Sequence, residues 1–323
     1  MPTPTPVDAQ AIEHAADLLR QGQLVALPTE TVYGLGADAA NPLAVAKIFT
    51  AKGRPADHPL IVHIADASQL ANWAEHIPES AYQLAKAFWP GPLTLVLNKK
   101  PEVPPAVTGG QSTVALRVPN NPVALALLAC FKGGIAAPSA NRFGRISPTR
   151  AQHVAEELGD SVACILDGGP CQVGLESTIL DLTGNKPAIL RPGRITRSQI
   201  KAVLKTDIAL SPQTKVRAPG MLAVHYAPNT LALLCPPETL TDLLDELCAQ
   251  GKQIGLLTFS SCFANLPCQY NLQLPTDAEH YEAALYDALR KLDNLALDQI
   301  LIEQPPSSEA WTAVNDRLEK ATV

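Results

Sequence analysis

The chain contains, near its beginning, the stretch Leu27-Pro28-Thr29-Glu30-Thr31-Val32-Tyr33-Gly34-Leu35-Gly36. A short apolar run over Gln23–Leu27 leads into it and is typical of a buried strand. Apolar residues at helical spacing follow over Asn41–Phe49, with Pro42 at a position typical of a first helical turn. We therefore expect a polar turn between a strand and a helix, where open α/β sheets bind their ligands. A plain connection with glycines for tight backbone is the alternative.

Composition and charge limit the class of protein. A chain of 323 residues is long for one domain and suits two, and its 46% hydrophobic content is typical of a globular protein with an ample core. We expect no membrane span and no secretory signal, because no run has the length or the apolar character of either. The net charge of −6 argues against a general nucleic-acid coat. The seven scattered cysteines predict reduced thiols in the cytoplasm.

The pattern of strands and helices predicts an α/β protein with two domains. Residues 1–205 alternate strand-like and helical segments and form the first domain. Residues 206–230 have little periodicity and several prolines, which is typical of a linker. Residues 231–323 alternate again and predict a smaller, separate α/β domain.

Cations and small polar residues follow the predicted elements of the first domain. Lys52 and Arg54 flank a glycine at a helix end, and a point charge beside a planar donor fork suits a polyphosphate. A solvated helix end stabilised by the macrodipole is the alternative. A later loop carries Ser139, Asn141 and Ser147, which form either an anion-binding nest or local turn bonds.

Three further residues lie in or beside apolar strands. Arg191 precedes a Pro-Gly pair and adds a cation at a strand end. Arg117 stands in an otherwise apolar strand, so its charge must be paired. Its partner is either an internal carboxylate, such as Glu30 or Glu176, or the carboxylate of a ligand. His63 lies in a similar strand, where a hydrogen-bonded core histidine is the commoner role.

The sequence lacks the patterns of several enzyme classes. It contains neither GxxxxGK[ST] nor GxGxxG, which argues against a Walker P-loop and a dinucleotide fold. It has no Ser–His–Asp order, no pair of catalytic carboxylates and no metal-ligand spacing. The residues therefore predict an anion-rich pocket for small molecules, which acts by positioning and charge stabilisation.

Several motifs, taken in order, resemble the YrdC/Sua5 family. They are Pro28–Gly36, Lys52–Pro55, Pro59–His63, Pro138–Asn141, Glu176–Ile179 and Arg191–Gly193. In the linker, Ala218–Met221 and His225–Pro228 resemble the Sua5 branch, which adds a C-terminal domain. The resemblance implies a twisted mixed-sheet YrdC-like domain with flanking helices and a smaller, Rossmann-like α/β C-terminal domain.

The resemblance also implies an activity, that of a threonylcarbamoyl-AMP synthase, which is a nucleotidyltransferase. Such an enzyme makes L-threonylcarbamoyladenylate and pyrophosphate from L-threonine, bicarbonate or CO2, and ATP with Mg²⁺. Its product feeds the t6A modification of tRNAs that read ANN codons. The implied partners are these substrates, the downstream proteins of t6A transfer and, weakly, RNA, with no membrane. The implied location is the cytoplasm.

Carried over residue by residue, the resemblance implies two subsites. The threonine subsite comprises Thr31, His63, Arg117, Ser177 and the backbone near Ala137. The ATP subsite comprises Lys52, Arg54, His58, Thr113, Ser139, Asn141, Ser147, Arg191 and His225. Lys52 and Arg54 are assigned to catalysis, through charge neutralisation at the phosphates, and Arg117 to the threonine carboxylate. Phe143 departs from the small residue usual in its loop, which leaves the packing of that loop open.

The linker has two possible roles. His225 and Tyr226 lie in its proline-bounded part, where small polar residues are the norm. We expect the segment to act as a lid that covers bound ATP and excludes water from the labile adenylate. Alternatively, Tyr226 packs on a domain surface and the segment is a tether.

Two other functions are possible. A carbamoyl-adenylate domain of the hydrogenase-maturation type would bring acylphosphatase and zinc-finger segments, which the sequence lacks. An RNA-binding module without catalysis would use a concave basic surface. The acidic composition and the missing aromatic stripe argue against RNA binding as the sole role.

Overall fold

The computed structural model describes residues 3–210, 216–222 and 224–322. These residues divide into two compact units. The first takes Met1–Phe143, Pro148–Gln172 and Glu176–Met221, and the second takes Gly144–Ser147, Val173–Leu175 and Leu222–Val323. The linker predicted over 206–230 therefore lies partly outside the described residues. None of the described helices is long and apolar enough to cross a membrane.

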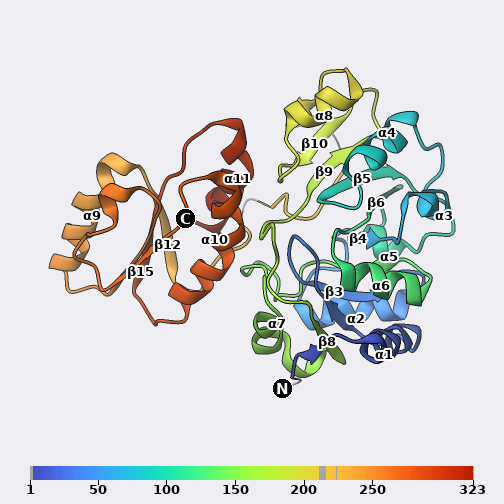
Figure 1. The fold of residues 1–323 in the computed structure, drawn as a ribbon, viewed down its shortest axis with the longest axis horizontal. Helices are drawn as coiled ribbons and strands as arrows, with labels where there is room; N and C mark the ends of the chain where they lie inside the picture. The colour runs from blue at the N-terminus through green and yellow to red at the C-terminus, as the bar shows by residue number, and fades with distance from the viewer. Residues whose placement is uncertain (1–2, 211–215, 223, 323) are drawn as a thin grey trace. The chain divides into compact units, whose positions relative to one another are not determined.

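A mixed sheet of eleven strands forms the centre of the first unit, in the order β1-β8-β2-β3-β7-β4-β6-β5-β9-β10-β11 (Figure 1). The mixed-sheet α/β prediction is confirmed. The strands are β1 (Thr5–Pro6), β2 (Val25–Leu27), β3 (Gly34–Asp38), β4 (Ile61–His63), β5 (Leu93–Asn98), β6 (Thr113–Arg117), β7 (Ile135–Ala136), β8 (Cys164–Asp167), β9 (Thr178–Asp181), β10 (Ala188–Arg191) and β11 (Ala209–Leu210).

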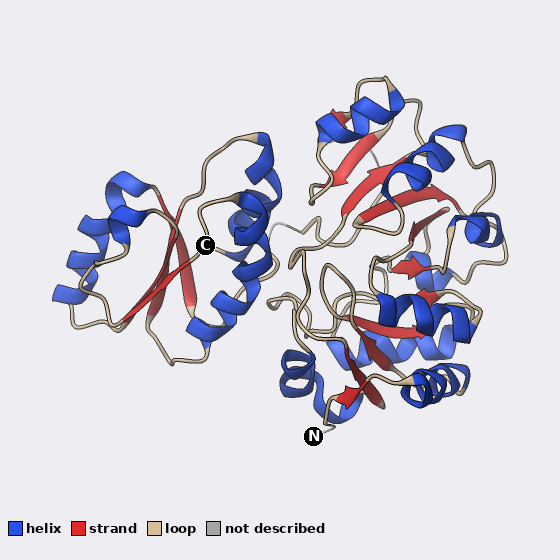
Figure 2. Ribbon diagram, viewed as in Figure 1, coloured by secondary structure: helices blue, strands red, loops and turns tan. Residues whose placement is uncertain are grey.

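Helices flank this sheet (Figure 2). They are α1 (Ala9–Arg20), α2 (Pro42–Lys52), α3 (Leu70–Trp73), α4 (Glu79–Phe88), α5 (Pro105–Thr108), α6 (Pro122–Phe131), α7 (Ala151–Leu158) and α8 (Arg197–Leu204), with 3₁₀ turns η1 (Ala67–Gln69) and η2 (Gly159–Ser161). The apolar sides of α2–α5, α7 and α8 and one face of the sheet form the main core, in which Val62 and Leu116 are fully buried. Helices α1 and α6 pack into a second apolar cluster, with Val25 and Ile135. Burial of this apolar surface is the main favourable term in folding.

Helix α2 shows how local sequence sets the position of a site residue. The side chain of Asn41 caps its start by accepting hydrogen bonds from the amides of Leu43 and Ala44. Gly53 ends it in the left-handed region, with φ at 62°, where a residue without Cβ meets no steric penalty. The helix therefore stops at a defined residue and leaves Lys52 and Arg54 on either side of that turn.

The opening stretch does not form the simple turn that we expected. Gly34–Asp38 is a strand, β3, and it pairs antiparallel with β2. The expected strand–turn–helix is therefore wrong, and the chain runs strand, loop, strand and then helix. The strand was not predicted because glycine has a low β propensity. At Gly36, however, the fold has no room for a side chain, whose Cβ would lie 2.9 Å from both Ile135 and Leu27. Close packing against both neighbouring strands explains why this strand has a glycine at position 36.

The face of the sheet opposite the main core carries the polar candidates. Strands β4 and β6 are parallel neighbours that pair Ile61 with Ala115 and His63 with Arg117. Since side chains alternate along a strand, these four lie on one face. Ile61 and Ala115 form a small apolar cluster with Ala218 of the linker. His63 and Arg117 lie next to that cluster, two residues further along their strands.

The second unit is a smaller α/β structure with a parallel sheet, as predicted. Its strands pair in the order β12-β15-β13-β14 and all run parallel. Its elements are β12 (Leu231–Cys235), α9 (Pro237–Ala249), β13 (Ile254–Thr258), η3 (Ser261–Phe263), β14 (Tyr270–Gln273), α10 (Ala278–Asp293), β15 (Gln299–Glu303), η4 (Glu309–Trp311) and α11 (Thr312–Ala321). Strand β14 was not predicted, because it carries alternating polar side chains. Helix α5 of the first unit was not predicted either, because it is four residues long and rich in proline.

The end of the linker is anchored within the second unit. Tyr226 is 1% exposed and its ring stacks on Tyr286 of α10 at 6.0 Å between centroids. The guanidinium of Arg317 in α11 lies 5.2 Å from the centre of the same ring. The backbone amide of His225 donates to the carbonyl oxygen of Lys320 at 2.9 Å. These contacts make the His-Tyr pair part of the core of this unit.

We expect Tyr226→Ala to destabilise the second unit by about 3–5 kcal/mol, because it removes a buried ring and leaves a cavity. Tyr226→Phe keeps the ring and its stacking, so it should cost much less than Tyr226→Ala. Hydrogen exchange of amides in α10 and α11 measures the effect without interference from the first unit. Equal protection of these helices in wild type and Tyr226→Ala would contradict the packing described.

Candidate functional site

A buried ion pair lies among the residues predicted to bind threonine. Nη2 of Arg117 is 2.6 Å from Oε1 of Glu30, and each side chain is 4% exposed. Nη1 donates to Oγ1 of Thr31 at 2.9 Å, and Nε donates to the carbonyl oxygen of Gly91 at 3.2 Å. Of the two carboxylates considered for Arg117, the partner is therefore Glu30 and not Glu176.

A short hydroxyl-centred turn holds Glu30 and Thr31 in place. Oγ1 of Thr29 accepts hydrogen bonds from the amides of Thr31 and Val32, at 3.1 and 3.2 Å, and donates to the carbonyl oxygen of Val32 at 2.7 Å. Threonine hydroxyls stabilise turns in this way. The loop between β2 and β3 thus presents Thr31 to Arg117 with little freedom, although every residue in it is buried.

His63 lies beside Arg117 as a neutral imidazole. The two residues are register partners on parallel strands, and His63 is 3% exposed. Burial first, and then the positive charge of Arg117, lower the pKa of His63 to about 3. A neutral imidazole near a cation offers hydrogen bonds without adding charge, which suits recognition of a hydroxyl group.

Ser177 and Arg191 connect the two predicted subsites. Nη2 of Arg191 donates to Oγ of Ser177 at 3.2 Å and to its carbonyl oxygen at 2.9 Å. Oγ of Ser177 also lies 2.7 Å from Oγ1 of Thr94. Nη1 of Arg191 donates to the carbonyl oxygen of Pro219 in the linker at 3.2 Å. A residue predicted to bind threonine and a residue predicted to bind ATP are therefore in direct contact.

Gly193 allows the segments that carry Ser177 and Arg191 to lie this close together. A side chain there would lie 2.4 Å from the amide nitrogen of Thr178 and 2.7 Å from the carbonyl carbon of Ser177. Because both are backbone atoms, they cannot move aside as a flexible side chain would. The Arg-Pro-Gly motif thus brings the end of β10 against the start of β9, where the two site residues meet.

Lys52 holds the loop that carries Ser139 and Asn141. Its ammonium donates to the carbonyl oxygen of Ser139 at 2.5 Å and to that of Asn141. Burial first, and then the nearby charge of Arg54, lower the pKa of Lys52. The backbone of the same loop is tied to the start of β3, where the amide of Ala140 donates to the carbonyl oxygen of Tyr33 at 2.8 Å. Lys52 therefore holds the loop in a defined conformation.

Phe143 fills the space between two predicted ATP-binding side chains. The guanidinium of Arg54 lies 5.7 Å from the centre of its ring, and the ring of His58 meets it edge-on at 5.3 Å. Burial, and then the charge of Arg54, lower the pKa of His58. Nη2 of Arg54 donates to the carbonyl oxygen of Pro59 at 3.2 Å. The departure from a small residue thus produces an Arg–Phe–His cluster.

The remaining candidates are placed as follows. Thr113 begins β6 on the same face as Arg117, four residues earlier. Ala137 follows β7, and its amide donates to the carbonyl oxygen of Ile61 at 2.9 Å. Ser147 and His225 are buried and belong to the second unit. The structure therefore brings twelve of the fourteen candidates into the first unit: Thr31, Lys52, Arg54, His58, His63, Thr113, Arg117, Ala137, Ser139, Asn141, Ser177 and Arg191.

Sequence reasoning missed Thr94, which is fully buried on β5 and contacts Ser177. A signal was present, since Thr94 interrupts the apolar run Leu93–Leu97 as Arg117 interrupts its own strand. Polar residues inside an apolar strand need a partner, and here the partner belongs to the site.

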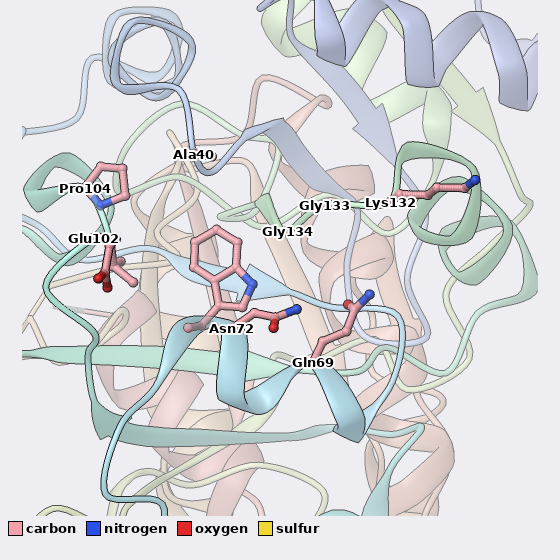
Figure 3. A pocket seen from close by; sticks show the side chains of 10 residues that line it. Ala40, Gln69, Asn72, Glu102, Pro104, Lys132, Gly133 and Gly134 are labelled. Atoms are coloured by element: carbon pink, nitrogen blue, oxygen red, sulfur yellow. The ribbon is translucent and has the colours of Figure 1, made fainter.

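A separate cavity of about 270 Å³ lies in the first unit away from these residues (Figure 3). Asn72 and Trp73 line it, and Figure 3 shows Gln69 on one side of Asn72 and Glu102 on the other. None of the predicted site residues lines it. Among the described residues, no group of three or more His, Cys, Asp or Glu side chains could hold a metal ion.

Comparison with known proteins identifies similar chains over the full length. A family profile of Sua5, YciO and YrdC proteins, described as "Telomere recombination", matches residues 17–193. A second, described as "Threonylcarbamoyl-AMP synthase, C-terminal domain", matches residues 195–323. The threonylcarbamoyl-AMP synthase of Bacillus subtilis is 47% identical, over 96% of this chain and 92% of the relative.

Two solved structures of Sua5 from Pyrococcus abyssi are also similar. The complex with L-threonine is 41% identical, with a TM-score of 0.93 over 99% of this chain and 97% of the other. A variant with a His-to-Ala and a Tyr-to-Ala substitution is 40% identical, with a TM-score of 0.92 over 99% of this chain and 96% of the other.

The lowered pKa of His63 predicts a pH-dependent stability. Above pH 6.5 both folded and unfolded chains hold this imidazole neutral, so its contribution is complete. As pH falls from 6.5 toward 3, the unfolded chain binds a proton that the folded chain excludes, and stability is lost. We expect a loss of about 2 kcal/mol from this residue by pH 5.

Denaturant unfolding of wild type and His63→Asn at pH 8 and pH 5 measures this contribution. The difference between the two pH values should be smaller in His63→Asn, whatever its stability at pH 8. His14→Asn, on the exposed side of α1, is the control. An unchanged pH dependence in His63→Asn would refute the neutral, buried state.

Proposed function

The chain belongs to the two-domain, Sua5-type family of threonylcarbamoyl-AMP synthases, and we propose that its first unit catalyses formation of L-threonylcarbamoyladenylate. The activity is that of a nucleotidyltransferase that supplies the t6A modification of tRNA. The proposed substrates are L-threonine, bicarbonate or CO2, and ATP, and pyrophosphate is the second product. A reaction that consumes ATP and serves tRNA belongs in the cytoplasm, the location we propose.

The contact between Ser177 and Arg191 is the observation that carries this proposal. Synthesis of an acyl adenylate requires the amino acid derivative and the α-phosphorus of ATP to meet in line. The hydrogen bond from Arg191 to Ser177, at 3.2 Å, supports a site in which the two predicted subsites adjoin each other. The reported complex of the P. abyssi protein with L-threonine supports the choice of amino acid.

The chemistry proceeds in two steps in this proposal. The amine of threonine is first carboxylated, and an oxygen of the carbamate then attacks the α-phosphorus while pyrophosphate leaves. Charge accumulates on the phosphate oxygens, so fixed cations lower the barrier more than a side-chain base would. Arg54, Lys52 and Arg191 are the cations that the chain offers, and Arg117 receives the threonine carboxylate.

Mg²⁺ enters the proposal with ATP. The described residues include no cluster of His, Cys, Asp or Glu able to form a metal site by themselves. The donor set of the predicted subsite consists of cations, hydroxyls and amides, which suits phosphate oxygens rather than a metal. A Mg²⁺ ion held by the phosphates would neutralise the leaving pyrophosphate.

We also propose that residues 1–205 form the catalytic domain, 206–230 a linker with a lid function, and 231–323 the C-terminal domain. The part that begins with Val216 lies on the first unit. Arg217 pairs there with Asp57 at 3.0 Å, and its amide donates to Oε1 of Gln111 at 2.7 Å. Further along, Tyr226 is fixed within the second unit. A linker attached at both ends moves with the domains, which supports a role in opening and closing.

Pyrophosphate release with ATP and bicarbonate, in the presence and absence of L-threonine, tests the function. We expect release that depends on threonine and not on carbamoyl phosphate. Dependence on carbamoyl phosphate would favour the hydrogenase-maturation type of reaction. RNA binding without any release of pyrophosphate would favour a binding module, and either outcome would overturn the proposal.

Arg54→Ala should lower synthesis by about one to two orders of magnitude, because a hydrogen bond to a charged group contributes about 1.5–3 kcal/mol. The same assay measures this, with thermal unfolding as a check on the Arg–Phe–His cluster. Arg20→Ala, at an exposed position on α1, is the matched control. Wild-type turnover by a folded Arg54→Ala protein would remove this residue from the site.

A further inference from the structure

The carboxylate of Glu30 has acceptor positions that no described residue fills. Glu30 is 4% exposed, and its approach to Nη2 of Arg117, at 2.6 Å, is an ion pair. Neither carboxylate oxygen accepts a hydrogen bond from a described residue. An ionised carboxylate has about four acceptor positions, and burying them without donors is costly. A ligand that brings N–H groups would relieve that cost.

The neighbours of Glu30 already have the chemistry of an amino acid site. Nη2 of Arg117 faces Glu30 and has no hydrogen-bond acceptor among the described residues, while Nε and Nη1 are held by Gly91 and Thr31. The planar arrangement of guanidinium donors is suited to a carboxylate. The site therefore presents one fixed cation and one fixed anion side by side, both removed from water.

A zwitterion is the ligand that matches such a pair. An α-amino acid carries a carboxylate and an ammonium on one carbon, about as far apart as the two protein charges. If Arg117 alone bound the substrate, the ammonium would enter a buried site without a counter-charge, and its desolvation would oppose binding. With Glu30 present, the four charges alternate in sign and each has an opposite neighbour.

We propose that Glu30 accepts hydrogen bonds from the α-ammonium group of the substrate, while Arg117 receives the substrate carboxylate. This assignment rests on the proposed function, since it takes the substrate to be an amino acid. It makes Glu30 a binding residue that selects for the ammonium group. A hydroxy acid of the same shape would lose this interaction.

A positioning role for Glu30 is the competing explanation. In that case Glu30 only holds the guanidinium of Arg117 in orientation and never touches the substrate. Both roles predict weaker binding of threonine when the carboxylate is removed. They differ in the affinity of a ligand that has the carboxylate but no ammonium. Only the positioning role predicts that this ligand loses as much affinity as threonine does.

Calorimetry with two ligands separates these roles. The ligands are L-threonine and the matching 2,3-dihydroxybutyrate, in which a hydroxyl replaces the ammonium. We expect wild type to prefer threonine, and Glu30→Gln to bind it about ten- to one-hundredfold more weakly. Binding of dihydroxybutyrate to Glu30→Gln should change by less than about threefold, so that the preference is largely lost. A parallel loss for both ligands would overturn the proposal.

The measurement on wild type alone also tests the assignment, so it does not depend on the folding of Glu30→Gln. A wild-type protein that binds threonine and dihydroxybutyrate equally well has no ammonium site, and the proposal fails. Glu102→Gln, which makes the same charge change at an exposed position, is the control and should keep the wild-type preference.

The failure of this inference can be told from failure of the proposed function. If wild type releases pyrophosphate with threonine while Glu30→Gln keeps the wild-type ligand preference, only the role of Glu30 is wrong. If wild type binds no threonine and releases no pyrophosphate, both are wrong.

Discussion

The ion pair between Arg117 and Glu30 is the constraint on which the rest of the site depends. Each charge costs several kcal/mol to remove from water, so the pair persists only where the fold supplies its geometry. Strand β6 supplies Arg117, and the hydroxyl-centred turn of Thr29 supplies Glu30 and Thr31. A site of this kind is organised before its substrate arrives, which reduces the reorganisation that the reaction must drive.

The order of the strands decides which candidates can meet. β4 and β6 are distant in sequence but adjacent in the sheet, so His63 and Arg117 are neighbours on one face. β9 and β10 pair antiparallel, which places Ser177 beside Arg191. Opposite faces of the same strands bury Val62 and Leu116 in the main core. The alternation of side chains along a strand thus assigns packing to one face and chemistry to the other.

Much of the fold and of the candidate site could be predicted from the sequence, wherever local sequence signals were strong. Asn41, Pro42 and Gly53 identified helix α2, and the isolated charge of Arg117 indicated a buried partner. The choice of Glu30 over Glu176 could not be predicted, because it depends on which strands are neighbours. Strand β3 was missed since its glycines have low β propensity, and their packing against other strands exists only in the folded chain.

The cations of the predicted ATP subsite divide into two kinds. Nζ of Lys52 donates to the carbonyl oxygens of Ser139 and Asn141, so this side chain holds the loop in place. The guanidinium of Arg54 lies against the ring of Phe143, and its Nη2 donates to the carbonyl oxygen of Pro59. Because the buried side chain of Lys52 holds the loop of Ser139 and Asn141, the amides and hydroxyls of this loop keep a constant arrangement. The side chain of Lys52 therefore acts first on the arrangement of this loop.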